Sequence, residues 1–111
     1  MATKLNFGSG KITYNELINI DFDKNINNQE DLLKEDLLQV QYGGSYLLDV
    51  GWHPEFDKTG QFIIQIINNY DWENPLLKKE ASFHDFHKSL SFCVKFIEKL
   101  INAGSIQEVN I

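Results

Sequence analysis

The sequence predicts an α+β fold, in which an antiparallel sheet of about four strands packs against a long C-terminal helix, with a shorter helix near the N-terminus. Residues 46–67 contain two alternating segments joined by a turn, which is typical of a β-hairpin. Residues 82–103 place apolar side chains at helical spacing after a capping signal. Because 111 residues is close to the commonest domain size, we expect a single domain over residues 1–111.

The two strands of the hairpin carry the clearest pattern. Over residues 46–53, one face includes the apolar Trp52, and the other face includes Asp49. Residues 54–60 combine a proline, acidic residues and a glycine, as turns do. Residues 61–67 are rich in isoleucine, which is stiff at its branched Cβ and fits a pleated sheet. Isoleucines fall on both faces of this segment, so we expect a central strand.

The other elements have weaker signals. Alternating apolar residues favour a strand over residues 17–22, although Tyr14, Leu17 and Ile18 would also suit a short helical turn. Asn28 fits an N-cap, which predicts a helix of about two or three turns over residues 29–37, followed by a strand at 38–42. Residues 76–81 predict a further strand, whose polar character suits a sheet edge.

The C-terminal helix is the best-defined single element. Ser82 and Asp85 have the spacing of a capping box, and Gly104 is placed to end the helix. Lysines occupy the face opposite the apolar one. Phe92 lies beside the lysines, where either a second element of this chain or a partner would cover it.

Composition narrows the classes of function. The formal net charge is −6, and all ten basic residues are lysines. Proteins that bind nucleic acid directly need a basic surface and usually arginine, so we expect no direct nucleic-acid binding. No segment is long and apolar enough to span a membrane, and the N-terminus lacks a secretion signal; both favour a cytoplasmic protein. The acidic surface either maintains solubility or steers the protein toward a basic partner.

Histidine and cysteine patterns give little support for a metal site or a reactive thiol. His84 and His87 share one side of a helix, but a zinc site needs further ligands and the sequence has no second His or Cys cluster. We therefore expect no metal and no cofactor. Cys93 lies among apolar residues, which favours a buried, inert thiol.

A histidine with two acids in the hairpin turn is the one arrangement that suits an enzyme. His53, Glu55 and Asp57 could form an acid–base site at the end of a strand, in a small enzymatic or ligand-binding domain. The simpler interpretation is an ordinary turn containing acids and a proline. We expect a protein that is not an enzyme and keep this turn as the alternative.

Two tryptophans lie among acidic residues at turns. The segments Asp-Val-Gly-Trp-His-Pro-Glu-Phe-Asp (49–57) and Asp-Trp-Glu-Asn-Pro (71–75) combine aromatic groups with carboxylates, which suits a surface that binds a basic protein. Structurally, the tryptophans could simply cap the ends of the sheet. The candidate contact residues are Asp49, Glu55, Asp57, Asp71, Trp72 and Glu73.

These two segments, with Gly-Gln-Phe (60–62) between them, resemble small bacterial immunity proteins of polymorphic and contact-dependent growth inhibition toxin systems. The resemblance covers roughly residues 38–101. It implies a cytoplasmic protein that binds and blocks the C-terminal domain of its own toxin, often a nuclease, without catalysis. Immunity families bind through different surfaces, so the resemblance assigns no contact. We expect a monomer, with a homodimer through Phe92 and an exposed strand edge as the alternative.

Overall fold

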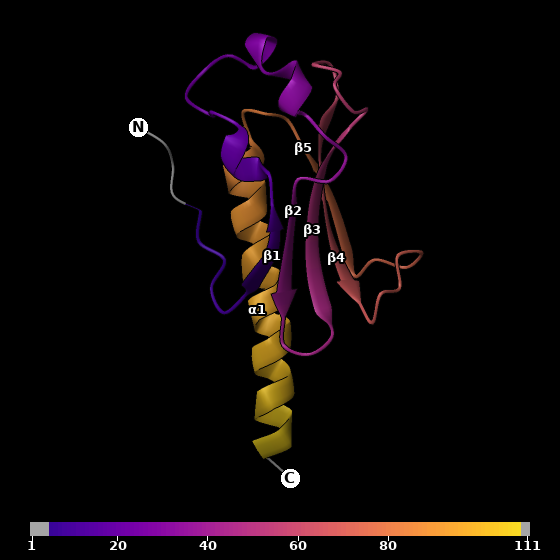
Figure 1. Ribbon diagram of the computed structural model, residues 1–111. Helices are drawn as coiled ribbons and strands as arrows, with labels where there is room; N and C mark the ends of the chain where they lie inside the picture. Colours follow the sequence, from indigo (N-terminus) through magenta and orange to yellow (C-terminus); the bar gives the residue numbers. More distant parts are fainter. Residues whose placement is uncertain (1–4, 110–111) are drawn as a thin grey trace.

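The computed structural model describes residues 5–109, and the side chains of residues 5–103. A five-stranded antiparallel sheet is covered on one face by a single long helix (Figure 1). The expected α+β fold is confirmed, although the sheet has five strands and not about four. The strands lie in chain order across the sheet, and the main elements are β1 (Lys11–Asn15), β2 (Leu38–Tyr42), β3 (Tyr46–His53), β4 (Gln61–Asn68), β5 (Leu77–Ala81) and α1 (Phe86–Val109).

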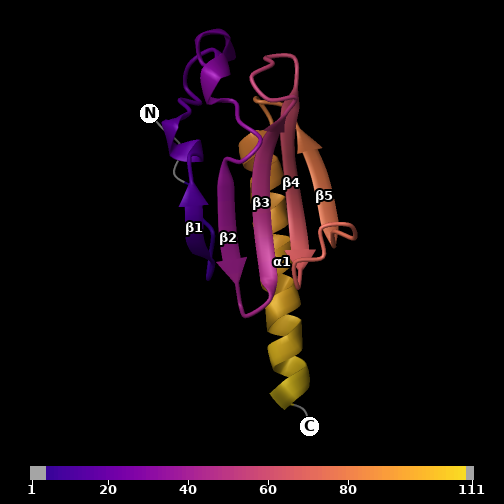
Figure 2. The same cartoon turned by 45° about the vertical axis from the view of Figure 1, so that its right-hand side comes forward.

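The predicted hairpin is β3 and β4, paired in register from Tyr46 opposite Asn68 to His53 opposite Gln61. Successive side chains of each strand therefore point alternately to the two faces of the sheet. One face is covered by α1, and the other faces the viewer in Figure 2, where the sheet lies in front of the helix. We call the second face the open face. One row of the open face crosses all five strands and consists of Tyr14, Gln39, Asp49, Gln65 and Lys78.

The covered face packs an aromatic cluster against the start of α1. The Phe62 ring lies 4.1 Å from that of Phe86 and 4.9 Å from that of Trp52, measured between centroids, and all three side chains are buried. One of the two bonds of the expected capping box precedes the helix: the Ser82 hydroxyl accepts the Asp85 amide at 3.1 Å. These contacts fix the start of α1 at the end of the sheet that carries the β3–β4 turn.

The expected N-terminal helix over residues 29–37 is wrong. This region contains only short 3₁₀ turns, η2 (Ile26–Asn28) and η3 (Glu30–Leu32). The leucines do not define one helical face. Leu33 and Leu37 are both fully buried. The backbone at Leu37 bonds to β3, because the Leu37 amide donates to the Val50 carbonyl at 2.9 Å. Bonding to the sheet replaces bonding within a helix.

The expected strand over residues 17–22 is also wrong. The chain forms β1 earlier and then a 3₁₀ turn, η1 (Leu17–Asn19). The Leu37 carbonyl accepts from the amides of both Glu16, at 2.7 Å, and Leu17, at 3.0 Å, and this turns the chain away from the sheet. Ile18 is consequently 76% exposed.

A close backbone approach joins β3 to the segment before β2. The Trp52 amide donates to the Lys34 carbonyl at 2.8 Å, so residues 34–37 run against the end of β3. A Cβ atom added to Gly51 would collide with the backbone oxygen of Glu35. Only glycine allows this approach, because every other residue carries that atom.

Helix α1 extends beyond Gly104, which does not end it as expected. Glycine costs a helix roughly 1 kcal/mol relative to alanine but keeps its backbone hydrogen bonds, so a helix can continue through it. Phe92 is 53% exposed, and its ring is covered from one side by the Lys79 ammonium of β5, 4.9 Å from the centroid. Within residues 5–109, no helix is both long and apolar enough to cross a membrane.

Candidate protein-binding surface

The six candidate contact residues fall in three separate places. Glu55 and Asp57 lie in the β3–β4 turn, whereas residues 71–73 lie in the β4–β5 loop at the other end of β4 (Figure 2). The eight residues of β4 separate these connections by roughly 26 Å, at about 3.3 Å per residue. Asp49 lies between them on the open face. A single small contact would not include all six.

The loop between β4 and β5 presents two large aromatic side chains to solvent. Tyr70 is 71% exposed and Trp72 is 44% exposed, and the acidic Asp71 and Glu73 alternate with them. We call residues 69–76 the aromatic loop.

The aromatic loop is ordered by its own backbone. The Asn69 amide donates to Ser45 at 3.0 Å, and the Leu76 amide donates to Ile66 at 2.8 Å, so both ends are attached to the sheet. Tyr70 adopts a left-handed conformation, with φ at 59°. Asn69 is also left-handed, and the Asp71 amide donates to the Asn68 carbonyl at 3.1 Å, so a tight turn over residues 68–71 sets this uncommon conformation.

The two tryptophans have different roles. Trp52 is only 1% exposed, and its indole nitrogen donates to the Asp57 carbonyl at 2.7 Å, so it belongs to the core. The Asp57 carboxylate accepts from the Thr59 hydroxyl at 2.7 Å and from the Thr59 amide at 2.9 Å, and these bonds lower the pKa of Asp57. Trp52 and Asp57 therefore stabilise the turn, and of the two tryptophans only Trp72 is available to a partner.

The histidine of the same turn is the basis of the acid–base alternative. His53 is exposed at the end of β3, and within residues 5–103 no hydrogen bond joins its side chain to Glu55 or Asp57. The acid–base site in this turn stays an untested alternative, because hydrogen bonds at such sites often form only when substrate binds.

Asp49 is the candidate residue with the most altered environment. It is half-buried in the middle of the open face, and its carboxylate accepts from the Gln39 amide nitrogen at 3.1 Å. Burial raises the pKa of the Asp49 carboxyl, and the negative charge of Asp36 raises it further, while the Gln39 bond and His53 oppose the change.

This raised pKa has a consequence for stability. A folded-state pKa above the unfolded value means that the charged carboxylate costs stability at neutral pH, and that the cost disappears as pH falls through the raised pKa to the ordinary value near 3.8. We therefore expect Asp49→Asn to increase the free energy of unfolding at pH 7, because asparagine can still accept the Gln39 bond. Urea denaturation at several pH values measures this gain, which should vanish in acid; an equal gain at pH 3 would contradict the assignment.

Asp36 and Glu16, two acids that the sequence analysis did not select, interact with Asp49 or with Tyr14 in the same row of the open face. The Tyr14 hydroxyl donates to Glu16 at 2.7 Å, and the negative charge of Asp36 acts on both Tyr14 and Asp49. We call Glu16, Asp36 and Asp49 the acidic patch; the Lys34 ammonium lies 3.3 Å from the Glu16 carboxylate and offsets part of its charge. Its members come from three different segments, so their arrangement depends on the strand order β1-β2-β3.

The histidines and the cysteine considered for a metal site or a reactive thiol lie on or near α1. His84 is exposed, and His87 packs its ring against Phe22, 4.6 Å between centroids. Among the side chains of residues 5–103, no three His, Cys, Asp or Glu residues are grouped so that they could hold a metal ion. Cys93 is buried, as expected, and burial raises the pKa of its thiol to about 11.

Among residues 5–103, the acidic patch and the aromatic loop are the two surface features that contain the sequence-predicted contact residues Asp49 and Asp71, Trp72 and Glu73. No family model, curated protein or solved structure matches this chain. We therefore infer a function from the chemistry of these two features, together with the sequence pattern.

Proposed function

We propose that this chain is an immunity protein, which binds a cognate toxin domain and neutralises it by occluding the active site. The observation that carries the proposal is the aromatic loop, in which Tyr70 and Trp72 are held exposed between acids. Tryptophan and tyrosine are the residues most enriched among energetically dominant contacts of protein interfaces. The resemblance of segments 49–57 and 71–75 to immunity proteins supports the same function.

Charge favours a basic partner, and we propose a nuclease. The chain carries −6, and α1, which lies against the face opposite the open face, carries the exposed Lys95 and Lys99, whereas Lys78 lies in the same open-face row as Asp49. The net negative charge would attract a basic active site, and we propose that the acidic patch receives it. There, carboxylates would occupy the positions that substrate phosphates take in the toxin.

We propose a monomeric, cytoplasmic protein for this role. Both sheet edges have features that discourage pairing with a second copy. The register of β1 is irregular between Ile12 and Tyr14, and β5 carries Lys78 and Lys79. Phe92 is partly covered by Lys79, which removes one reason to expect a dimer contact there.

A binding titration tests the proposal. The partner is the C-terminal domain of the protein encoded immediately upstream, titrated by calorimetry at physiological salt. We expect one-to-one binding with a dissociation constant of about 1 nM or lower, in the range of tight protein complexes. Binding that cannot be detected at micromolar concentrations would remove the proposal.

The electrostatic part of the proposal has its own readout, the association rate constant as a function of salt. Exposed charges steer association at low ionic strength and are screened at high ionic strength. We expect the association rate constant to fall by at least about tenfold between low salt and about 0.5 M salt, with a smaller change in the dissociation rate constant. An association rate that does not depend on salt would exclude charge steering while leaving the aromatic anchor in place.

A further inference from the structure

Three lysines and one phenylalanine form a row along the exposed side of α1. We call this row the lysine stripe, and its members, all exposed, are Lys88, Phe92, Lys95 and Lys99. At 100° per residue they lie within roughly 60° of the helix circumference, and about 16 Å of helix separates the first from the last. The stripe is opposite the side chains that α1 buries against the sheet, such as Phe86, Leu90 and Ile97.

A fourth lysine extends the middle of the stripe. Lys79 of β5 places its ammonium 4.9 Å from the centroid of the Phe92 ring. Between β5 and α1 lies a hollow of about 290 Å³, and its lining residues are Lys79, Asp85, Lys88, Ser89 and Phe92. Two lysines and one acid line this hollow, so its net charge is positive.

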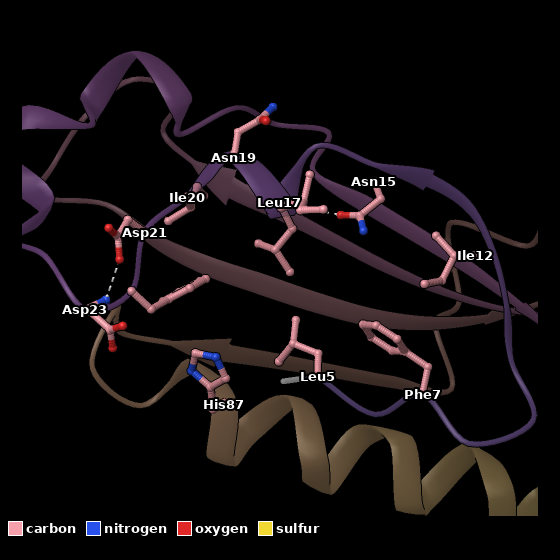
Figure 3. Close-up of a pocket in the computed structure, with 12 residues that line it drawn as sticks. Leu5, Phe7, Ile12, Asn15, Leu17, Asn19, Ile20, Asp21, Asp23 and His87 are labelled. Carbon is pink, nitrogen blue, oxygen red and sulfur yellow. Dashed lines mark hydrogen bonds between the residues drawn. The ribbon is translucent and has the colours of Figure 1, made fainter. Parts of the chain in front are cut away.

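Two acids beside α1, Glu98 and Asp23, lie on the side of the helix that meets the N-terminal segment. Within residues 86–103, Glu98 is the only acid of α1, and its carboxylate accepts from the Ser9 hydroxyl at 2.6 Å and from the Ser9 amide at 2.8 Å. Asp23 lies near His87, which points toward the N-terminal segment (Figure 3). His87 is roughly 110° around the helix from the centre of the stripe. Neither acid therefore belongs to the stripe.

Charge is divided unevenly along the chain. Residues 5–76 hold twelve acids and four lysines, whereas residues 77–103 hold three acids and five lysines. Asp49 lies on the open face, on the far side of the sheet from α1 (Figure 2). Packed layers are roughly 10 Å apart, and physiological salt screens exposed charges over about 8 Å. The two sides of the molecule can therefore attract opposite charges.

We propose that the lysine stripe binds the surface of an anionic phospholipid bilayer, with α1 parallel to the membrane plane and Phe92 among the lipid headgroups. Each lysine close to such a surface strengthens binding about fivefold, so the three lysines of the stripe with Lys79 suffice for reversible attachment. Burial of the exposed Phe92 ring adds to the affinity. This proposal does not rest on the proposed function, because the stripe shares no residue with the acidic patch or the aromatic loop.

The form of the stripe favours a bilayer over an acidic protein. Protein interfaces are depleted of lysine and enriched in arginine, whose planar guanidinium pairs with carboxylates in a fixed geometry. All the cations here are lysines, which are point charges and suit a fluid array of headgroups. Helix α1 forms a layer of its own on one face of the sheet (Figure 1), so a flat surface can touch the members of the stripe together.

Sedimentation with vesicles tests the attachment. The full-length protein is mixed with vesicles of phosphatidylglycerol and phosphatidylcholine in equal parts, or of phosphatidylcholine alone, at about 0.1 M ionic strength. We expect the anionic vesicles to bind at least about tenfold more tightly than the neutral ones, and about 0.5 M salt to release the protein. Equal binding to both kinds of vesicle, or binding to neither, would overturn the proposal.

The double variant Lys88→Gln/Lys95→Gln tests the position of the contact. It removes two charges from the stripe without changing a buried side chain, and we expect affinity for anionic vesicles to fall roughly 25-fold. Lys24→Gln/Lys58→Gln is the matched control, because both lysines are exposed and lie outside the stripe. This control should stay within about twofold of wild type. Equal losses in the two double variants would show that the stripe is not the contact.

Polyglutamate is the probe for an acidic polypeptide as the partner. It is titrated into the same variants and into Phe92→Ala, which should weaken binding to anionic vesicles about fivefold through lost apolar burial. We expect polyglutamate to bind more weakly than the anionic vesicles. If polyglutamate binds through Lys88 and Lys95 and the anionic vesicles do not bind, the stripe recognises an acidic polypeptide and the bilayer proposal is wrong.

Discussion

Replacing Gly51 by alanine should destabilise the protein by about 3 kcal/mol, at the upper end of the usual cost of overpacking. The added Cβ would collide with the backbone oxygen of Glu35, and a backbone atom cannot move aside as the end of a flexible side chain can. Hydrogen bonds to β3 hold the chain on both sides of Glu35: the Trp52 amide donates to the Lys34 carbonyl, and the Leu37 amide donates to the Val50 carbonyl. Relief would therefore require breaking part of this attachment.

Gly44→Ala is the matched control for this substitution. No atom lies within 4 Å of the position that its Cβ would take, and its φ is not in the left-handed region. Its effect should stay within about 0.5 kcal/mol, as for most surface substitutions. Urea denaturation of both variants measures the difference. Equal stability of the Gly51 and Gly44 variants would show that residues 34–37 do not pack against β3 as described.

Replacing Trp72 by alanine should weaken binding to the cognate toxin domain by about 2–4 kcal/mol, or roughly 30- to 1,000-fold in the dissociation constant. The side chain is 44% exposed in the free protein and would be buried by the partner. Trp72 makes no part of the buried core, so the melting temperature should change little. An intact fold with lost affinity is the signature of a contact residue.

Phe92→Ala is the control for the loss of an exposed aromatic side chain. Phe92 is 53% exposed, but it lies on α1 and contacts Lys79 of β5, so it belongs to neither the aromatic loop nor the acidic patch. Its replacement should leave toxin affinity unchanged. If instead Phe92→Ala weakens binding and Trp72→Ala does not, the partner contacts the helix side of the molecule, and the aromatic loop is not the anchor.

The sequence predicts the fold best where pattern and environment agree. Alternation over β3 and β4 identifies the hairpin because one face of each strand is buried by α1. The failed helix over residues 29–37 shows the opposite case. Leu33 and Leu37 are buried by contacts distant in sequence, and the backbone bonds that place them involve Val50 and Trp52, which no local pattern reveals.

The candidate surface is less accessible to sequence reasoning. Trp52 and Trp72 both lie among acids near a proline, yet strand register buries the first and leaves the second exposed. The acidic patch depends on how β1, the segment before β2 and β3 lie side by side, so Asp36 could not be joined to Asp49 beforehand. The residue types predict a protein-binding surface, but only the three-dimensional structure distinguishes the exposed candidates from the buried ones.

The central claim is neutralisation, and the most direct measurement is inhibition of the toxin domain in vitro. Nuclease activity of the C-terminal domain encoded upstream is followed while this protein is added in increasing amounts. The proposal predicts that activity falls linearly and is lost at one equivalent, as tight occlusion of an active site requires. Full nuclease activity in the presence of a saturating excess would contradict it, even if the two proteins bind.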